Sequence, residues 1–313
     1  MEHPLTQKLF SHPTAIQTHR HGRTVHPLCH SQNVRGFPLA AQRSWMGGWK
    51  KQSHRSHPNV WRLQETHIAS EVEARSAAQL WTSLWGRQHI TPVDGTSYWS
   101  VSGDKTGGVA LLLDPRQRHV CQPWQQELWS KRFIALVVDD TLFIDVYAPN
   151  DRHEREDFFE GLRRWPWPQL EVIFFVNCNC VQSPHFDRLG SRRSGRPESP
   201  ASDKLISTLD PEDAQALASS ALEDDVVKPL DYFTYWNAQS ASHIDRFYVC
   251  KTWTLTVQQV QVRLPVSFSD HLQKHYTCHP KARPCVIAVN RGSFYIQSAP
   301  RRRPKSTVTS WTS

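Results

Sequence analysis

The sequence predicts an α/β domain in which strands and helices pack in layers. Several short apolar runs are bounded by Gly, Pro or polar residues, as strands usually are, and other segments repeat apolar residues at helical spacing. The two patterns alternate along the chain without an internal repeat. A length of 313 residues is sufficient for one large domain with tails.

In chain order, the first expected strand contains Val60 and Leu63 and ends at Glu65. A helix over 68–85 follows, because apolar residues recur there every three or four positions. The apolar runs GGVALLL, FIALVV and LFIDVYA, within 107–148, predict three further strands, since each is bounded by polar or Gly/Pro residues.

In the second half, the segment at 154–165 predicts a helix, with acids early and arginines late as a helix dipole favours. The continuous apolar run at 170–176 is typical of a strand buried on both faces. A polar loop is expected over 191–202, followed by helices in SDKLISTL and PEDAQALASSAL. The segments IDRFYV and VRLPVSF predict the last strands.

The net charge of +8 is unevenly distributed. Residues 1–57 hold eight Lys or Arg and one acid, and residues 281–313 hold seven and none, so the region between them is net acidic. Because the basic excess lies mostly in the flanks, it is not independent support for a nuclease. We predict a disordered or out-of-frame leader at 1–29, rather than a metal-binding segment, a domain at 30–275 and a basic tail at 276–313.

Seven cysteines, an odd number without a secretory leader, indicate free thiols in a reducing compartment. The C-N-C sequence at 178–180 is one residue too tight for the C-x-x-C pair of a zinc site. No apolar run approaches the ~20 residues needed to cross a bilayer. We therefore expect a soluble intracellular protein with no membrane partner.

Six polar motifs occur in order along the chain: SQNVRG, LQETH, DVYAPN, VNCNCV, SHIDRFYV and SDH. An Asp-His pair alone is weak evidence, because such pairs more often lie on the surface than in an active site. Six motifs in order are hard to obtain by chance. Together with GGVALLL and FTYWN, they resemble the endonuclease/exonuclease/phosphatase superfamily, the group of exonuclease III and DNase I. The nearer similarity is to the endonuclease of LINE-type non-LTR retrotransposons, over roughly residues 30 to 275.

The resemblance implies a four-layer sandwich of two mixed sheets with helices outside, in which loops at one end of the sheets gather the motifs. It implies a Mg²⁺-dependent phosphodiesterase, with Mn²⁺ as an alternative ion, that nicks DNA to expose a 3′-hydroxyl for primed reverse transcription. It also implies a monomer that works in the nucleus. The parent element would encode a reverse transcriptase, which this chain lacks, so we expect a truncated copy.

The resemblance assigns the metal to Glu65 and Asp270, with Asn33 near the same ion and facing phosphate. Carboxylates suit this role, because Mg²⁺ is held by one or two of them together with water and phosphate oxygens. Taken alone, Glu65 is better explained as an acid at a helix N-terminus, and the ordered set of motifs reverses that preference.

The remaining assigned groups handle phosphate and water. The resemblance places His271 against the scissile phosphate with Asp245 orienting its ring, and Tyr147 and Asn150 as a phosphate-facing pair. The alternatives are an ion pair of Asp245 with its neighbour Arg246 and a buried strand tyrosine at position 147.

One departure concerns the fourth motif, where the family has Gly-Asp-Phe-Asn and this chain has Val176, Asn177, Cys178 and Asn179. Asn179 matches, but an amide replaces the aspartate that activates water. Asn177 cannot accept a proton, which removes a contribution of ~10²–10⁴ in rate. We therefore expect impaired nicking. The alternatives are an inactive remnant that at most binds nucleic acid, and a relative acting on phosphoinositides or small phosphate esters.

Overall fold

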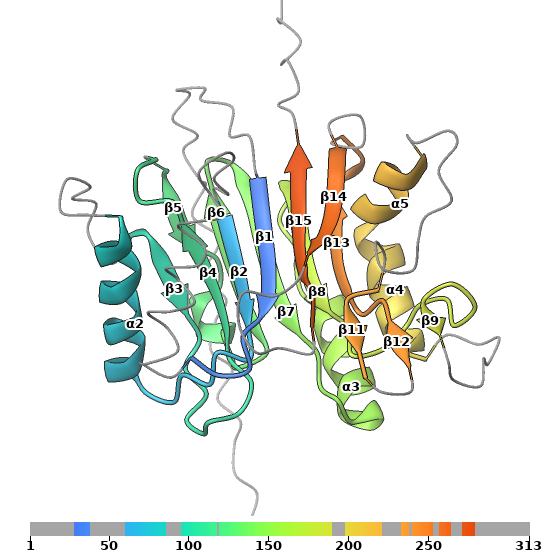
Figure 1. Ribbon diagram of the computed structural model, residues 1–313, viewed down its shortest axis with the longest axis horizontal. Helices are drawn as coiled ribbons and strands as arrows, with labels where there is room; N and C mark the ends of the chain where they lie inside the picture. The colour runs from blue at the N-terminus through green and yellow to red at the C-terminus, as the bar shows by residue number, and fades with distance from the viewer. Residues whose placement is uncertain are drawn as a thin grey trace, which may run out of the picture. The chain divides into compact units, whose positions relative to one another are not determined.

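The computed structural model describes residues 28–37, 60–85, 95–117, 119–189, 198–220, 233–237, 240–252, 257–263 and 271–278, all within a compact unit, Met1–Lys281 (Figure 1). A second unit, Ala282–Ser313, lies outside the described residues. The described helices include none that is long and apolar enough to span a membrane.

Two six-stranded sheets form the centre of this unit. In spatial order, the first sheet contains β14 (Val257–Arg263), β15 (Gln273–Cys278), β1 (Leu28–Asn33), β2 (Val60–Gln64), β4 (Val109–Leu113) and β3 (Ser97–Trp99). The second sheet contains β10 (Glu212–Asp213), β13 (Asp245–Val249), β8 (Glu171–Asn177), β7 (Thr141–Tyr147), β6 (Phe133–Val138) and β5 (Cys121–Pro123). Both sheets are mixed, because β1 runs parallel to β2 and β7 parallel to β8, whereas the other pairs are antiparallel. A small third sheet joins β11 (Tyr235–Trp236), β12 (Ala241–Ser242) and β9 (Arg188–Leu189).

Helices cover the outer face of each large sheet. Helix α2 (Glu71–Leu84) packs through Trp81 on the first sheet, and α3 (Arg152–Arg163) and α4 (Pro200–Leu209) pack on the second. Helix α5 (Ala214–Ser220) contacts β13 and β14, and a short 3₁₀ helix, η2, spans Gln126–Leu128. This order of helix, sheet, sheet and helices confirms the predicted four-layer α/β sandwich.

Local sequence sets where the helices begin. Ser70 caps α2 by accepting from the backbone N–H of Glu73, and Asp151 caps α3 in the same way. Ser199 caps α4, with Pro200 in the first turn. The loop prediction over 191–202 is therefore wrong in its last residues, because the cap and proline start a helix there.

The core between the sheets explains the continuous apolar runs. In β4, Leu111 faces the second sheet and Leu112 faces α2. In β8, Phe175 faces the first sheet and Phe174 faces the helices α3 and α4. All five positions of β4 and the last five of β8 are buried, so these sequences show no polar alternation. The strands β3 and β5 have only three residues each, and β1 and β15 consist mostly of polar residues, so these four lacked the signal and were not predicted.

Two predicted boundaries differ slightly from the structure. The first strand begins at Leu28 and the last strand ends at Cys278, so the folded region extends a few residues beyond both ends of the predicted domain at 30–275. Of the strand expected at 262–268, only 262–263 belong to β14. Residues 264–270 lie outside the described part of the chain.

A buried ion pair crosses the apolar space between the sheets. Arg62 of β2 donates from Nε to a carboxylate oxygen of Asp145 in β7, and neither side chain is exposed. The same guanidinium donates to Ser31 Oγ at 3.1 Å and to the Val146 carbonyl at 3.0 Å. Gln64 Nε2 reaches that carbonyl at 3.2 Å. Burial raises the pKa of Asp145 to about 7, against the opposing charge of Arg62. These groups form a polar contact between the two sheets.

Replacement of Arg62 by Met is expected to lower the free energy of unfolding by about 3–5 kcal/mol, because Asp145 is left buried without its partner. Urea denaturation measures the loss. The double variant Arg62→Met/Asp145→Leu is expected to recover most of it, since apolar residues then fill the space. As a control, Lys251→Met at an exposed ion pair is expected to cost under about 1 kcal/mol. Equal losses for the buried and exposed variants would contradict this role.

Candidate active site

A cleft of about 500 Å³ opens at one end of the two large sheets. The parallel strands β1 and β2 end at Asn33 and Gln64, and β7 and β8 end at Tyr147 and Asn177. Carboxyl ends of parallel strands meet at one edge of a sheet, where α/β proteins usually bind ligands. The cleft is lined by Arg35, Glu65, Asn150, Asn179, Arg188, Tyr235, Asn237, Ser240, Ser242, Ile244 and His271.

Glu65 lines the cleft from the turn after β2, with a left-handed φ of 52°. The turn is held by a 3.1 Å hydrogen bond from Thr66 N to the Gly108 carbonyl. A Cβ on Gly108 would lie 2.3 Å from Thr66 Oγ1, so the approach requires glycine. Glu65 Oε1 accepts hydrogen bonds from the Tyr147 hydroxyl at 2.6 Å and from Asn33 Nδ2 at 2.9 Å. Two donors thus fix this carboxylate.

Tyr147 reaches across from the second sheet to make its bond to Glu65. Its side chain is buried, and the Arg132 guanidinium lies 4.7 Å from its ring centre. Burial raises the pKa of Tyr147, and the charge of Glu65 raises it further. The hydroxyl therefore stays protonated and acts as a donor at neutral pH.

His271, which also lines the cleft, forms a buried pair with Asp245. His271 Nδ1 lies 2.8 Å from Asp245 Oδ2, and the Tyr235 ring centre lies 5.1 Å from that of His271. Burial opposes ionisation of Asp245, but the charge and hydrogen bond of His271 outweigh it, so its pKa is lowered. A carboxylate can only accept, so the proton on His271 Nδ1 points at Asp245.

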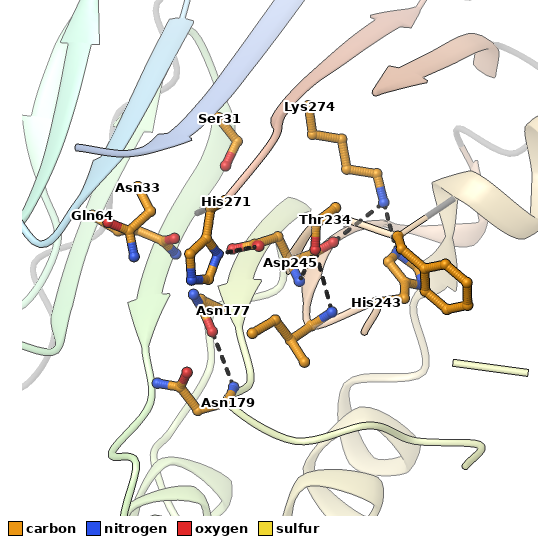
Figure 2. A network of polar contacts seen from close by, with 12 residues as sticks. Ser31, Asn33, Gln64, Asn177, Asn179, Thr234, His243, Asp245, His271 and Lys274 are labelled. Atoms are coloured by element: carbon orange, nitrogen blue, oxygen red, sulfur yellow. Dashed lines mark hydrogen bonds and ion pairs between the residues drawn. The ribbon is translucent and has the colours of Figure 1, made fainter. Parts of the chain in front are cut away.

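Asn177 lies between these two groups, at the end of β8. It stands opposite Tyr147 on one side and Asp245 on the other. Its Oδ1 accepts from the backbone N–H of Asn179 at 3.0 Å, while its Nδ2 is buried without a hydrogen-bond partner among the described residues (Figure 2). Asn179 donates from Nδ2 to the Ala148 carbonyl at 2.6 Å. The amide of Asn177 is thereby held with its donor end toward His271.

The structure brings most of the predicted site residues together. Asn150 lines the same cleft. Arg246, the alternative partner of Asp245, forms ion pairs with Asp187 and Asp213, both at 2.5 Å. Asp270, the second expected metal ligand, lies outside the described residues.

Sequence reasoning missed a second layer of polar groups behind the His271–Asp245 pair. The Thr234 hydroxyl accepts from the Asp245 backbone N–H at 3.1 Å. Lys274 lies with its Nζ 2.8 Å from His243 Nε2 and 3.3 Å from the Asp245 carbonyl (Figure 2). Thr234 and His243 stand within motifs that were recognised, FTYWN and SHIDRFYV. A single lysine in a strand carries no comparable signal.

The donor set of the cleft is compatible with a hard divalent cation. Glu65 offers a carboxylate at the cleft wall, and Mg²⁺ is commonly held by one carboxylate completed with water and phosphate oxygens. The described residues contain no group of three or more His, Cys, Asp or Glu side chains that could enclose a metal. A site built from protein ligands alone is therefore not formed within them.

No family model matches the chain, and no curated protein matches it in sequence. Solved structures share its fold. An AP endonuclease from Archaeoglobus fulgidus matches with a TM-score of 0.58 at 11% identity, over 80% of this chain and 99% of that one. The catalytic domain of Xenopus laevis APE2 matches with 0.56 at 16%, over 82% and 94%. The endonuclease domain of TRAS1, a telomere-specific non-LTR retrotransposon, matches with 0.49 at 12%, over 80% and 98%, too low a score to add weight.

Stability is expected to fall in acid because of His243. Burial lowers the pKa of His243 to about 3, and the charges of Lys274 and Arg246 lower it further. Between about pH 6.5 and 3 the unfolded chain binds a proton there that the folded protein does not, so the unfolding free energy decreases as the pH falls. His243 is expected to contribute a loss of about 2 kcal/mol between pH 7 and 5.

Urea unfolding at the two pH values measures this contribution. The His243→Gln variant keeps an acceptor for Lys274 but does not titrate, so its stability is expected to change less over the same interval. An identical pH dependence in both proteins would contradict the assignment.

Proposed function

From the premise that the chain has the endonuclease/exonuclease/phosphatase-like fold, we propose that it is a Mg²⁺-dependent phosphodiesterase that nicks DNA and is weakened at its water-activating position. The observation that carries the proposal is the meeting of two polar groups in one cleft. Glu65, fixed by Tyr147 and Asn33, faces the cleft together with the His271–Asp245 pair.

Each residue has a chemical task in this proposal. Glu65 would hold Mg²⁺, or Mn²⁺ in its place, with Asp270 as a second carboxylate. The bound ion would relieve charge on the phosphate. His271, held by Asp245, would donate from Nε2 to a phosphate oxygen when protonated. Asn150 and Asn179 would offer amide donors to the same group.

Asn177 limits the proposed activity. Its Oδ1 already accepts from Asn179, and an amide has no basicity with which to take a proton from water. The attacking water therefore lacks a general base at this position. General-base assistance is worth about 10²–10⁴ in rate, so slow nicking is expected rather than altered specificity.

The type of nuclease and its setting are part of the proposal. The motifs DVYAPN, FTYWN and IDRFYV support a retrotransposon endonuclease that prepares a 3′-hydroxyl for a reverse transcriptase. DNA is then the partner, the chain acts as a monomer, and the nucleus is its place of action.

The Asn177→Asp variant is expected to nick supercoiled plasmid about 10²–10⁴-fold faster than the unaltered chain with Mg²⁺ present, because it restores a general base. Conversion of supercoiled to open-circular DNA measures the rate. Both proteins are expected to be inactive with EDTA.

Two further changes in the Asn177→Asp background serve as controls. Glu65→Gln keeps the shape of the side chain but removes the charge that holds the ion, and His271→Gln removes the group facing phosphate. Both are expected to abolish the gain. Equal rates for the unaltered chain and Asn177→Asp would refute the role given to position 177.

A second candidate is a catalytically inactive remnant that binds nucleic acid. Two observations favour it: the amide at Asn177, and the basic excess at residues 1–57 and 281–313. Salt-sensitive retention of DNA, with no Mg²⁺-dependent nicking even in the Asn177→Asp variant, would support the remnant over the nuclease.

A further inference from the structure

We propose that Lys274 is a positioning residue for the Asp245–His271 pair, because its buried ammonium ties the backbone of Asp245 to the strand that follows His271. The inference rests on the proposed function only in treating this pair as part of the active site. The contacts themselves are independent of any activity.

The two members of the pair come from different sheets. Asp245 begins β13 of the second sheet, whereas His271 lies just before β15 of the first sheet. Lys274 is fixed in the first sheet, where it stands opposite Ser31 of β1 and Val262 of β14. The distance between His271 and Asp245 therefore depends on what joins β15 to β13.

Lys274 makes this connection. Its side chain crosses to β13, where Nζ lies 3.3 Å from the Asp245 carbonyl oxygen and 2.8 Å from His243 Nε2 (Figure 2). The backbone N–H of Asp245 donates to Thr234 Oγ1 at 3.1 Å. Thr234 is itself joined to the His271 segment by the Leu272 N–H, 2.6 Å from its carbonyl. Asp245 is thus held at both its N–H and its carbonyl.

The charges around Lys274 set the direction of these bonds. Asp213, Asp187 and Asp245 favour its charged form, and Arg246 opposes it; burial is the larger effect and lowers the pKa of Lys274 to about 8. The ammonium is therefore charged at neutral pH and donates to His243.

His243 completes the chain of contacts. It is neutral, because its pKa is lowered to about 3 by burial and by its cationic neighbours. With Nε2 accepting from Lys274, the proton lies on Nδ1, which is 3.4 Å from Asp187 Oδ1. Asp187 in turn binds Arg246. A lysine is almost never fully buried without such partners, and an apolar side chain here would leave the Asp245 carbonyl without this donor.

The test uses the proton between His271 Nδ1 and Asp245, which is expected to give a low-field proton resonance in NMR spectra of the whole chain. The resonance is assigned by its disappearance in Asp245→Asn. In Lys274→Met, which keeps the length and bulk of the side chain, loss of the resonance is expected, although neither bonded residue has changed. A resonance that persists in this variant would overturn the proposal.

A second variant separates positioning from stability. In Lys274→Met/His243→Leu no buried nitrogen of His243 is left without its donor, so folding is expected to recover relative to Lys274→Met. The resonance is still expected to be absent, because nothing holds the Asp245 carbonyl. Its return would overturn the proposal, since Lys274 would then serve only to satisfy His243.

The readout does not depend on nicking. If the Asn177→Asp variant fails to cleave while the resonance responds to Lys274 as described, the proposed function fails and the positioning role stands. If Asn177→Asp restores cleavage and the resonance persists in Lys274→Met, the proposed function stands and the positioning role fails.

Discussion

The Arg62–Asp145 contact is the constraint on which the cleft depends, because it is a buried ion pair that joins the two sheets within their apolar core. Apolar surfaces tolerate a small lateral shift, whereas a shift here would leave two charges unpaired in a medium of low dielectric. The alignment of the two sheets matters most at the cleft. Glu65 arrives from the first sheet and Tyr147 from the second, and their 2.6 Å hydrogen bond exists only if the sheets keep their register.

The sequence predicted what depends on local pattern. The strands β4, β7 and β8 are buried on both faces, so each appears as an apolar run, and helices α2 and α3 show the expected spacing. Edge strands such as β3 and β5 have three residues each and give too little pattern. The site motifs were found through a family resemblance, since Glu65 by itself is indistinguishable from an ordinary helix-flanking acid.

The groups that hold the site in place could not be predicted in this way. Lys274 and His243 are separated by 31 residues, and Arg62 and Asp145 by 83. From periodicity alone, a charged residue inside a strand is expected to be exposed. Its buried partner lies on the other sheet and becomes visible only once the two sheets are packed together. The amide at Asn177 was noticed from the motif, but its orientation comes from the backbone N–H of Asn179.

The glycine at position 108 has an implication for how such a chain loses its chemistry. An added Cβ would lie 2.3 Å from Thr66 Oγ1, so any other residue would force Thr66, the neighbour of Glu65, to move and would itself hold a strained φ of 92°. Gly108 is not among the residues that line the cleft. One base change in its codon is therefore expected to disturb the turn at Glu65 while leaving every polar motif intact, so the motifs alone do not guarantee that the cleft forms.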